Sequence, residues 1–243
     1  MRAGQAGCHG TSFLVVLILG SAALLLSACG GGGGGSSPPP ANLASAPGLA
    51  AMSAYYQGTH SVTLSASYGG STYTAHDTLT PNAQTAFIFG FGPYPNSTEV
   101  LTILKDGNPF SSATTTQFYY VTPVFSFAGA LGNVPGSYVY PNQSQGIHTT
   151  INVGDSGPLF TGTLYHDQTT MTADATETIS YSVLPDSPTA LDFCTIAVIT
   201  PTAPNPDMLT NTSQTNCYRI DATGNVTFFK ATVVIGGLTL TFQ

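Results

Sequence analysis

Apolar residues alternate with threonine and serine over much of this chain, and that period of two constrains its fold more than any other feature. In residues 231–242, two alternating runs flank the dipeptide Gly236-Gly237. A Gly-Gly pair supplies the positive φ angles that a two-residue hairpin turn needs. Pairing the runs across this turn places the apolar side chains on one face and threonines on the other. The predicted apolar pairs are Ile235 with Leu238, Val233 with Leu240, and Ala231 with Phe242.

Residues 62–79 have the same design around a second glycine pair, Gly69-Gly70. Val62 begins an alternating run, and the returning run carries its apolar residues on the same face. Asp77 is the exception, because the register places it opposite Val62 on the apolar side. The sequence leaves two explanations open: a turn longer than two residues, or a position near the rim of that face.

The remaining strand candidates are separated by Gly, Pro, Asn and Asp, which is the spacing expected of a sandwich or a barrel. No segment beyond the N-terminal apolar stretch has a convincing 3.6-residue period. The sequence therefore predicts an all-β fold, an antiparallel β-sandwich or β-barrel built from hairpins, with no substantial helix outside the N-terminal signal. The further candidates are residues 86–91, 100–105, 117–127, 146–153, 159–166, 170–184, 190–200, 217–220 and 226–230.

Composition narrows the functional class. Only 6% of the 243 residues are charged, and 4 Lys+Arg stand against 11 Asp+Glu, for a formal net charge of −7. A nucleic-acid binder needs a face rich in lysine and arginine, so we expect no nucleic-acid partner. Intrinsic disorder is also disfavoured, because 42% of the residues are apolar and 10% are aromatic.

The N-terminal segment has the features of an export signal. Residues 13–26 form a continuous apolar stretch of 14 residues, which is short for a membrane-spanning helix. The stretch ends in Leu26-Ser27-Ala28-Cys29. This motif resembles the lipobox of bacterial lipoproteins, in which an aliphatic residue and two small residues precede the lipidated cysteine. The resemblance implies a signal peptide over residues 1–28 and a palmitate-bearing lipid anchor on Cys29, but it points to no functional family.

The residues after Cys29 imply a location and a tether. Position 30 is glycine rather than aspartate, which by resemblance to lipoprotein sorting in Gram-negative bacteria favours the outer membrane, on either its periplasmic or its exposed side. Residues 29–51, rich in Gly, Ser and Pro, are predicted to form a leash. Residues 52–243 would then form the β-domain, with a diverged duplication and a break near residue 155 as an open alternative.

The four cysteines have three predicted fates. Cys8 leaves with the signal peptide, and Cys29 takes the lipid. Cys194 and Cys217 remain, and an even pair in an exported protein predicts a disulfide.

One loop resembles a catalytic motif. Residues 154–158 read Gly-Asp-Ser-Gly-Pro, similar to the nucleophile loop of chymotrypsin-like serine proteases but lacking the second glycine after the serine. The resemblance implies a hydrolase with Ser156 as nucleophile, His76 as base and an aspartate such as Asp106 to orient it. The alternative is an ordinary turn, because Asp, Ser, Gly and Pro are typical turn residues. We favour the turn, since the interval from His76 to Ser156 is short for two barrels.

No metal or cofactor is predicted. The dipeptides His76-Asp77 and His166-Asp167 each offer one ligand at most to a given site, because adjacent strand residues point to opposite faces.

Two aromatic clusters are the best ligand-binding candidates. They lie in residues 87–94, with Phe87, Phe89 and Phe91, and in residues 118–127. Such residues form core, and they also line cavities that hold apolar ligands. The sequence thus predicts a lipid-anchored, non-enzymatic binding or interaction module, whose partner is an apolar small ligand or an envelope protein. The alternative is the serine hydrolase.

Overall fold

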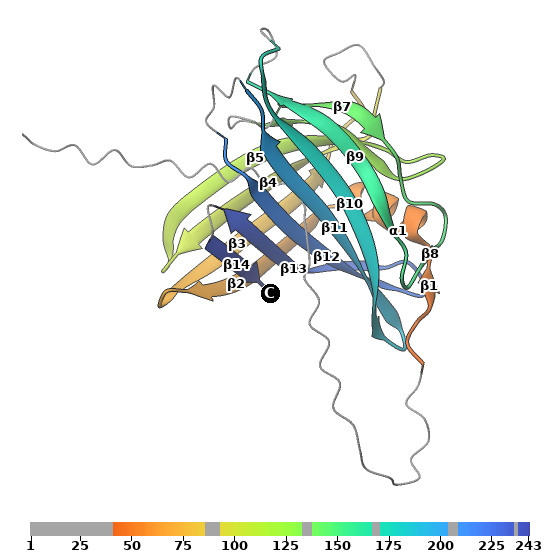
Figure 1. Ribbon diagram of the computed structural model, residues 1–243. Helices are drawn as coiled ribbons and strands as arrows, with labels where there is room; N and C mark the ends of the chain where they lie inside the picture. The colour runs from red at the N-terminus through yellow and green to blue at the C-terminus, as the bar shows by residue number, and fades with distance from the viewer. Residues whose placement is uncertain (1–40, 86–92, 133–137, 167–170, 204–208, 236–237) are drawn as a thin grey trace, which may run out of the picture.

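The computed structural model describes residues 41–85, 93–132, 138–166, 171–203, 209–235 and 238–243. Twelve strands form one antiparallel sheet, and one short helix, α1 (Gly48–Tyr56), lies against it (Figure 1). Two short strands, β1 (Ser45–Ala46) and β8 (Ile151–Asn152), pair with each other outside that sheet. The twelve strands are β2 (His60–Tyr68), β3 (Ser71–Pro81), β4 (Asn96–Lys105), β5 (Asn108–Tyr120), β6 (Ser126–Gly132), β7 (Tyr138–Ser144), β9 (Ser156–Tyr165), β10 (Ala173–Ser187), β11 (Ala190–Pro201), β12 (Thr212–Asp221), β13 (Val226–Ile235) and β14 (Leu238–Phe242).

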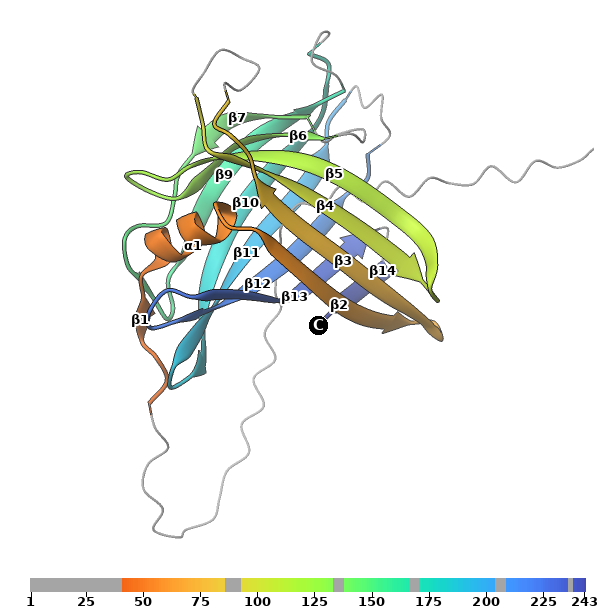
Figure 2. The ribbon, with the colours of Figure 1, turned by 180° about the vertical axis from the view of Figure 1, so that it is seen from behind.

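The sheet is a meander that curls into a nearly closed barrel. Its order is β14-β13-β12-β11-β10-β9-β7-β6-β5-β4-β3-β2, so each strand lies beside its neighbour in the chain apart from β8. The two edges meet, because the amide N–H of Ser65 donates to the carbonyl of Gln243 and that of Gln243 donates back to Ser65, at 3.2 and 3.0 Å. Figure 2 shows β2 and β14 side by side from behind. The all-β prediction is confirmed, and of its two alternatives the sheet is barrel-like. Within the described ranges, no helix has the length and apolar character needed to cross a bilayer.

Both hairpin registers agree with the sequence prediction. In β13 and β14, Ile235 pairs with Leu238 and Ala231 with Phe242. In β2 and β3, Tyr68 pairs with Ser71 across a two-residue turn, whose glycines have φ angles of 59° and 81°. The register continues to Val62 opposite Asp77 without a shift. The turn is therefore no longer than two residues, and Asp77 lies on the inner face.

Alternation divides the sheet into an apolar inner face and a hydroxyl-rich outer face. A single cluster of buried side chains runs through the inside of the barrel, with members from nearly every strand. Threonine and serine occupy most of the opposite positions and are exposed or half-buried. Hydroxyl groups, rather than charged groups, therefore solvate the outer face of this weakly charged chain. Inner-face residues include Leu64, Ala75, Leu101, Ile179, Phe193, Ile199, Phe228 and Leu240, and outer-face residues include Thr63, Thr74, Thr98, Thr116, Thr178 and Thr241.

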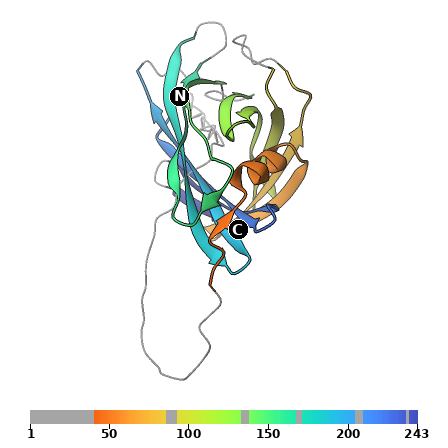
Figure 3. The same cartoon turned by 90° about the vertical axis from the view of Figure 1, so that its right-hand side faces the viewer.

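Helix α1 fills one end of the barrel. Figure 3 shows it lying between the two walls of the curled sheet. Met52 and Tyr56 are 0% and 2% exposed. A Cβ at Gly48 would lie 2.5 Å from Cγ2 of Ile151, so only glycine permits this approach to β8. The ordered part therefore begins before residue 52, where the sequence predicted a leash, because residues 45–51 are small and apolar enough to pack.

Two predicted strands differ from the observed ones, and a third cannot be compared. The stretch 117–127 is divided between β5 and β6 by a turn that contains the cis peptide bond Thr122-Pro123. Of residues 146–153, only Ile151–Asn152 is a strand. The predicted strand at residues 86–91 lies outside the described residues.

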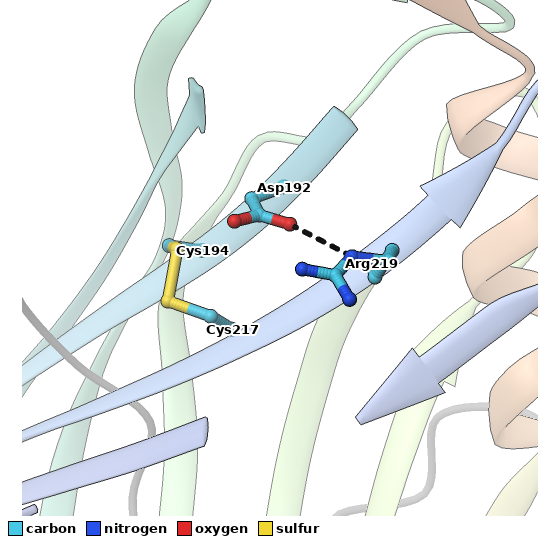
Figure 4. Close-up of a disulfide and its surroundings, with 4 residues drawn as sticks. All are labelled: Asp192, Cys194, Cys217 and Arg219. Atoms are coloured by element: carbon cyan, nitrogen blue, oxygen red, sulfur yellow. Dashed lines mark ion pairs between the residues drawn. A yellow bond between two sulfur atoms is a disulfide. The ribbon is translucent and has the colours of Figure 1, made fainter. Parts of the chain in front are cut away.

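Cys194 and Cys217 occupy directly opposed positions on β11 and β12. Their Cα atoms are 4.1 Å apart and their sulfur atoms 2.12 Å apart, as a disulfide (Figure 4). Both face outward, next to the pair formed by Asp192 and Arg219, whose nearest atoms are 3.7 Å apart. The bond joins neighbouring strands that already pair, so it reinforces one hairpin.

We expect no free thiol in the unfolded, unreduced mature protein when it is purified from membranes, because Cys29 is the predicted lipid site and the other two cysteines are paired. Maleimide labelling followed by mass spectrometry measures this. The variant Cys194→Ser should expose one thiol, that of Cys217. A stoichiometric signal from the wild-type protein without reductant would contradict the pairing.

Candidate functional site

Strand alternation splits the second aromatic cluster between the two faces of the sheet. Tyr119 points inward and Phe118 and Tyr120 point outward. Across the turn, Phe125 and Phe127 again lie inside. The two halves of this cluster therefore have different environments.

The inward half belongs to the core. Tyr119, Phe125 and Phe127 are 0%, 0% and 5% exposed. Their ring centroids lie 5.6, 5.2 and 5.7 Å from that of Tyr56, the last residue of α1. The Tyr119 hydroxyl also donates to the Tyr56 carbonyl at 2.7 Å. These rings fix the helix in the barrel end and leave no ligand cavity among themselves.

The outward half contributes to a surface pocket. We call it the tyrosine pocket, a hollow of about 230 Å³ on the outer face, to which β5, β6 and β7 all contribute. Tyr120 is the last residue of β5, Ala128 belongs to β6 and Tyr140 to β7. Tyr94 comes from the first aromatic cluster, so the structure brings residues of the two predicted clusters together. The lining consists of Tyr94, Tyr120, Ala128, Tyr140, Pro141, Asn142, Gln143 and Ser144.

A buried asparagine holds Tyr94 in place. Asn96, 3% exposed, donates through its side-chain amide to the carbonyl of Ala83, the hydroxyl of Thr85 and the carbonyl of Tyr94, each at 3.2 Å. The backbone of Tyr94 also forms a bridge with Thr85. These contacts join the two ends of the segment between β3 and β4. Phe87, Phe89 and Phe91, in the same segment, lie outside the described residues.

The tyrosine pocket is uncharged. Burial, followed by a hydrogen bond with Tyr94, raises the pKa of Tyr120 to about 12, so its hydroxyl stays protonated at neutral pH. The lining contains no acidic or basic side chain. Of the basic residues after Cys29, Lys105 lies at the opposite end of β4 from Asn96, and Arg219 and Lys230 lie on β12 and β13.

No protein-family model, curated protein or solved structure matches this chain.

The structure does not bring the predicted catalytic residues together. Ser156 begins β9 and pairs with Ser182, whereas β3, which carries His76, is separated from β9 by four strands of the sheet. The ring Nδ1 of His76 lies 2.9 Å from the hydroxyl of Thr63, on the outer face. Asp106 lies in the turn between β4 and β5, where its carboxylate accepts from the amide N–H of Thr72. None of the described hydrogen bonds joins Ser156 to a histidine. Cys29, the predicted lipid site, lies outside the described residues.

Three carboxyl groups lie on the inner face of the barrel: Glu177 is buried, and Asp77 and Glu99 are half-buried. The sequence pattern singles out only Asp77. Asp77 and Glu99 lie on adjacent strands, and the side-chain amide of Gln117 donates to Glu99. Glu177 lies apart on β10, 2% exposed, between Gly162 and Ile199 of the neighbouring strands. Among the residues the structure describes, no ion pair involves these three groups, and no group of three metal-binding side chains occurs.

Burial raises the pKa of all three groups. It raises the pKa of Asp77 to about 6 and that of Glu177 to about 8. The pKa of Glu99 also rises, first by burial and then by the nearby Asp77 carboxyl. A carboxyl whose pKa is higher in the folded than in the unfolded state stabilises the fold at low pH and loses that contribution as the pH rises through the folded pKa.

We therefore expect the free energy of unfolding to fall by a few kcal/mol between pH 5 and pH 9. Urea denaturation at several pH values measures this. The variant Glu177→Gln should be the more stable protein at pH 9. Its free energy of unfolding should fall less steeply than that of the wild type between pH 5 and pH 8, because only Asp77 and Glu99 then contribute to the slope. If the free energy of unfolding of that variant falls with pH as steeply as that of the wild type, Glu177 does not have a raised pKa in the folded protein.

Proposed function

We propose that this protein is a lipid-anchored cell-envelope protein of the outer membrane that acts as a non-enzymatic binding module. The anchor is the lipid on Cys29, and the binding site is the tyrosine pocket. The lipobox-like motif at residues 26–29 supports the anchor. The described part of the chain begins at Ala41. If the intervening residues form the predicted leash, it would reach roughly 20 Å. The domain would thus stay within about its own diameter of the membrane surface.

One observation carries the binding role: three tyrosines from separate segments line one hollow on a face otherwise covered by hydroxyl side chains. An exposed aromatic concavity in a hydroxyl-rich surface is typical of ligand sites, because water solvates the ring faces poorly. The inside of the barrel, by contrast, is occupied by its own side chains and by α1. Binding at the outer face needs no opening of the barrel.

We expect immobilised mature protein to retain an envelope component that the double variant Tyr120→Ala/Tyr140→Ala loses. Tyr68→Ala is the matched control, because Tyr68 is 52% exposed and is not part of the pocket lining. Detergent extracts of the envelope are passed over the three proteins, and the bound fractions are compared by mass spectrometry. Equal retention by the double variant would contradict the role of the pocket. Thermal melting of each protein shows whether the variants are folded.

A further inference from the structure

The tyrosine pocket has the geometry of an aromatic cage. The rings of Tyr94 and Tyr120 stand at 82° to each other with centroids 5.2 Å apart, and they form a corner. Tyr140 adds a third ring to the lining, near enough to Tyr120 to influence its titration. Rings that meet at steep angles present several electron-rich faces to one volume, and a cation in that volume is attracted to each face.

Two polar side chains of the lining, Asn142 and Ser144, already hydrogen-bond within the protein. The side chain of Tyr94 lies close enough to the Tyr120 hydroxyl to raise the pKa of Tyr120. The side-chain amide of Asn142 donates to the Thr163 hydroxyl at 2.9 Å, and the Ser144 hydroxyl donates to the carbonyl of Phe127 at 2.9 Å. A sugar or a primary ammonium group needs several directed partners. A quaternary ammonium group needs none, because its methyl groups carry the positive charge and contact ring faces directly.

The charge of the chain favours the same ligand. After Cys29 the sequence has three basic residues, Lys105, Arg219 and Lys230, against eleven acidic ones. The pocket lining contains none of the three. A cation therefore approaches an acidic protein at a site without local repulsion.

We propose that the tyrosine pocket binds a quaternary ammonium group, such as the trimethylammonium end of choline. This inference rests on the proposed function, because it assigns a ligand class to the same pocket. The group can come from a free small molecule or from a choline lipid headgroup, and both present the same chemistry to the rings.

Calorimetric titration of the mature chain carrying Cys29→Ala tests the ligand class. The probes are choline and 3,3-dimethylbutan-1-ol, a neutral compound of the same shape in which carbon replaces nitrogen. Choline should bind about tenfold more tightly than the alcohol. Equal affinities, absence of choline binding, or preferential binding of methyl glucoside would each overturn the inference. Those results leave the capture experiment with envelope extracts as the separate test of the proposed function.

Paired substitutions of Tyr120 test the role of the ring. Tyr120→Phe keeps the aromatic face and should retain choline affinity within about twofold, whereas Tyr120→Leu should lose about tenfold. Equal losses in both variants would overturn a contact through the ring face. Sedimentation with phosphatidylcholine and phosphatidylglycerol vesicles then distinguishes the sources. Selective binding to phosphatidylcholine assigns the headgroup, and choline binding without vesicle binding assigns a free ligand, so either result supports the cage.

Discussion

Replacing Cys29 with alanine should abolish acyl labelling of this protein and release it from the membrane fraction. The thiol of Cys29 is the predicted attachment point for the lipid, and no other residue of the lipobox-like motif could accept it. Two or three acyl chains contribute about 0.8 kcal/mol per buried CH₂ group, which is enough for stable anchoring. Without them the hydroxyl-rich outer face offers little to hold the protein in a bilayer.

Metabolic labelling with an alkyne-bearing palmitate analogue, followed by fractionation, measures both effects. Cys8→Ala is the matched control, because Cys8 lies within the predicted signal peptide and should leave the labelling unchanged. Label that persists in the Cys29→Ala protein would contradict the lipid anchor. Label lost from both variants would indicate a failure of export instead.

Replacing Tyr56 with alanine should destabilise the fold by about 3–5 kcal/mol. Tyr56 is 2% exposed at the C-terminal end of α1. Its ring packs against those of Tyr119 in β5, Phe127 in β6 and Phe125 just before β6. Its hydroxyl also lies 3.2 Å from that of Tyr218 on the opposite wall. The substitution removes both the packing and this link, and it leaves a cavity in the barrel end.

Urea denaturation measures the change in the free energy of unfolding. Tyr56→Phe should lose about 1 kcal/mol, because it keeps the ring and removes only the hydroxyl group. Tyr68→Ala should change stability by no more than about 0.5 kcal/mol, since that side chain is 52% exposed. A loss below 1 kcal/mol for Tyr56→Ala would show that α1 does not stabilise the barrel.

The sequence predicts the hairpins of this fold because their information is local. The two glycine pairs and the alternation on either side define the register, and both registers hold in the structure. Closure of the sheet depends on Ser65 meeting Gln243, which no local pattern encodes. Helix α1 does carry a signal: its buried residues recur at the period of a helix. Leu49 and Ala50, on its other side, are also apolar and obscure that pattern. The buried set is Gly48, Ala51, Met52, Tyr55 and Tyr56.

The candidate site could be predicted only in part. The two aromatic clusters were visible, and alternation could assign Phe118 and Tyr120 to one face. Whether these side chains are buried depends on which face of the sheet becomes the outer one. The direction in which the sheet closes decides that. Tyr140 lies outside both predicted aromatic clusters and reaches the pocket through β7, so no sequence signal connects it to Tyr120. Asp77 stands out in the sequence as a misfit on the apolar face. Only the register shows that it lies on the inner face, because a carboxyl without a partner is rare there.

The most direct test of the binding role is the response of individual tyrosine rings. Nuclear magnetic resonance of the mature protein carrying ring-labelled tyrosine, assigned through single phenylalanine substitutions, separates the pocket rings from the core rings. Titration with the retained envelope component should shift the signals of Tyr94, Tyr120 and Tyr140 and leave those of Tyr56 and Tyr119 in place. Shifts confined to the two core tyrosines, or no shift in any ring, would contradict the tyrosine pocket as the binding site.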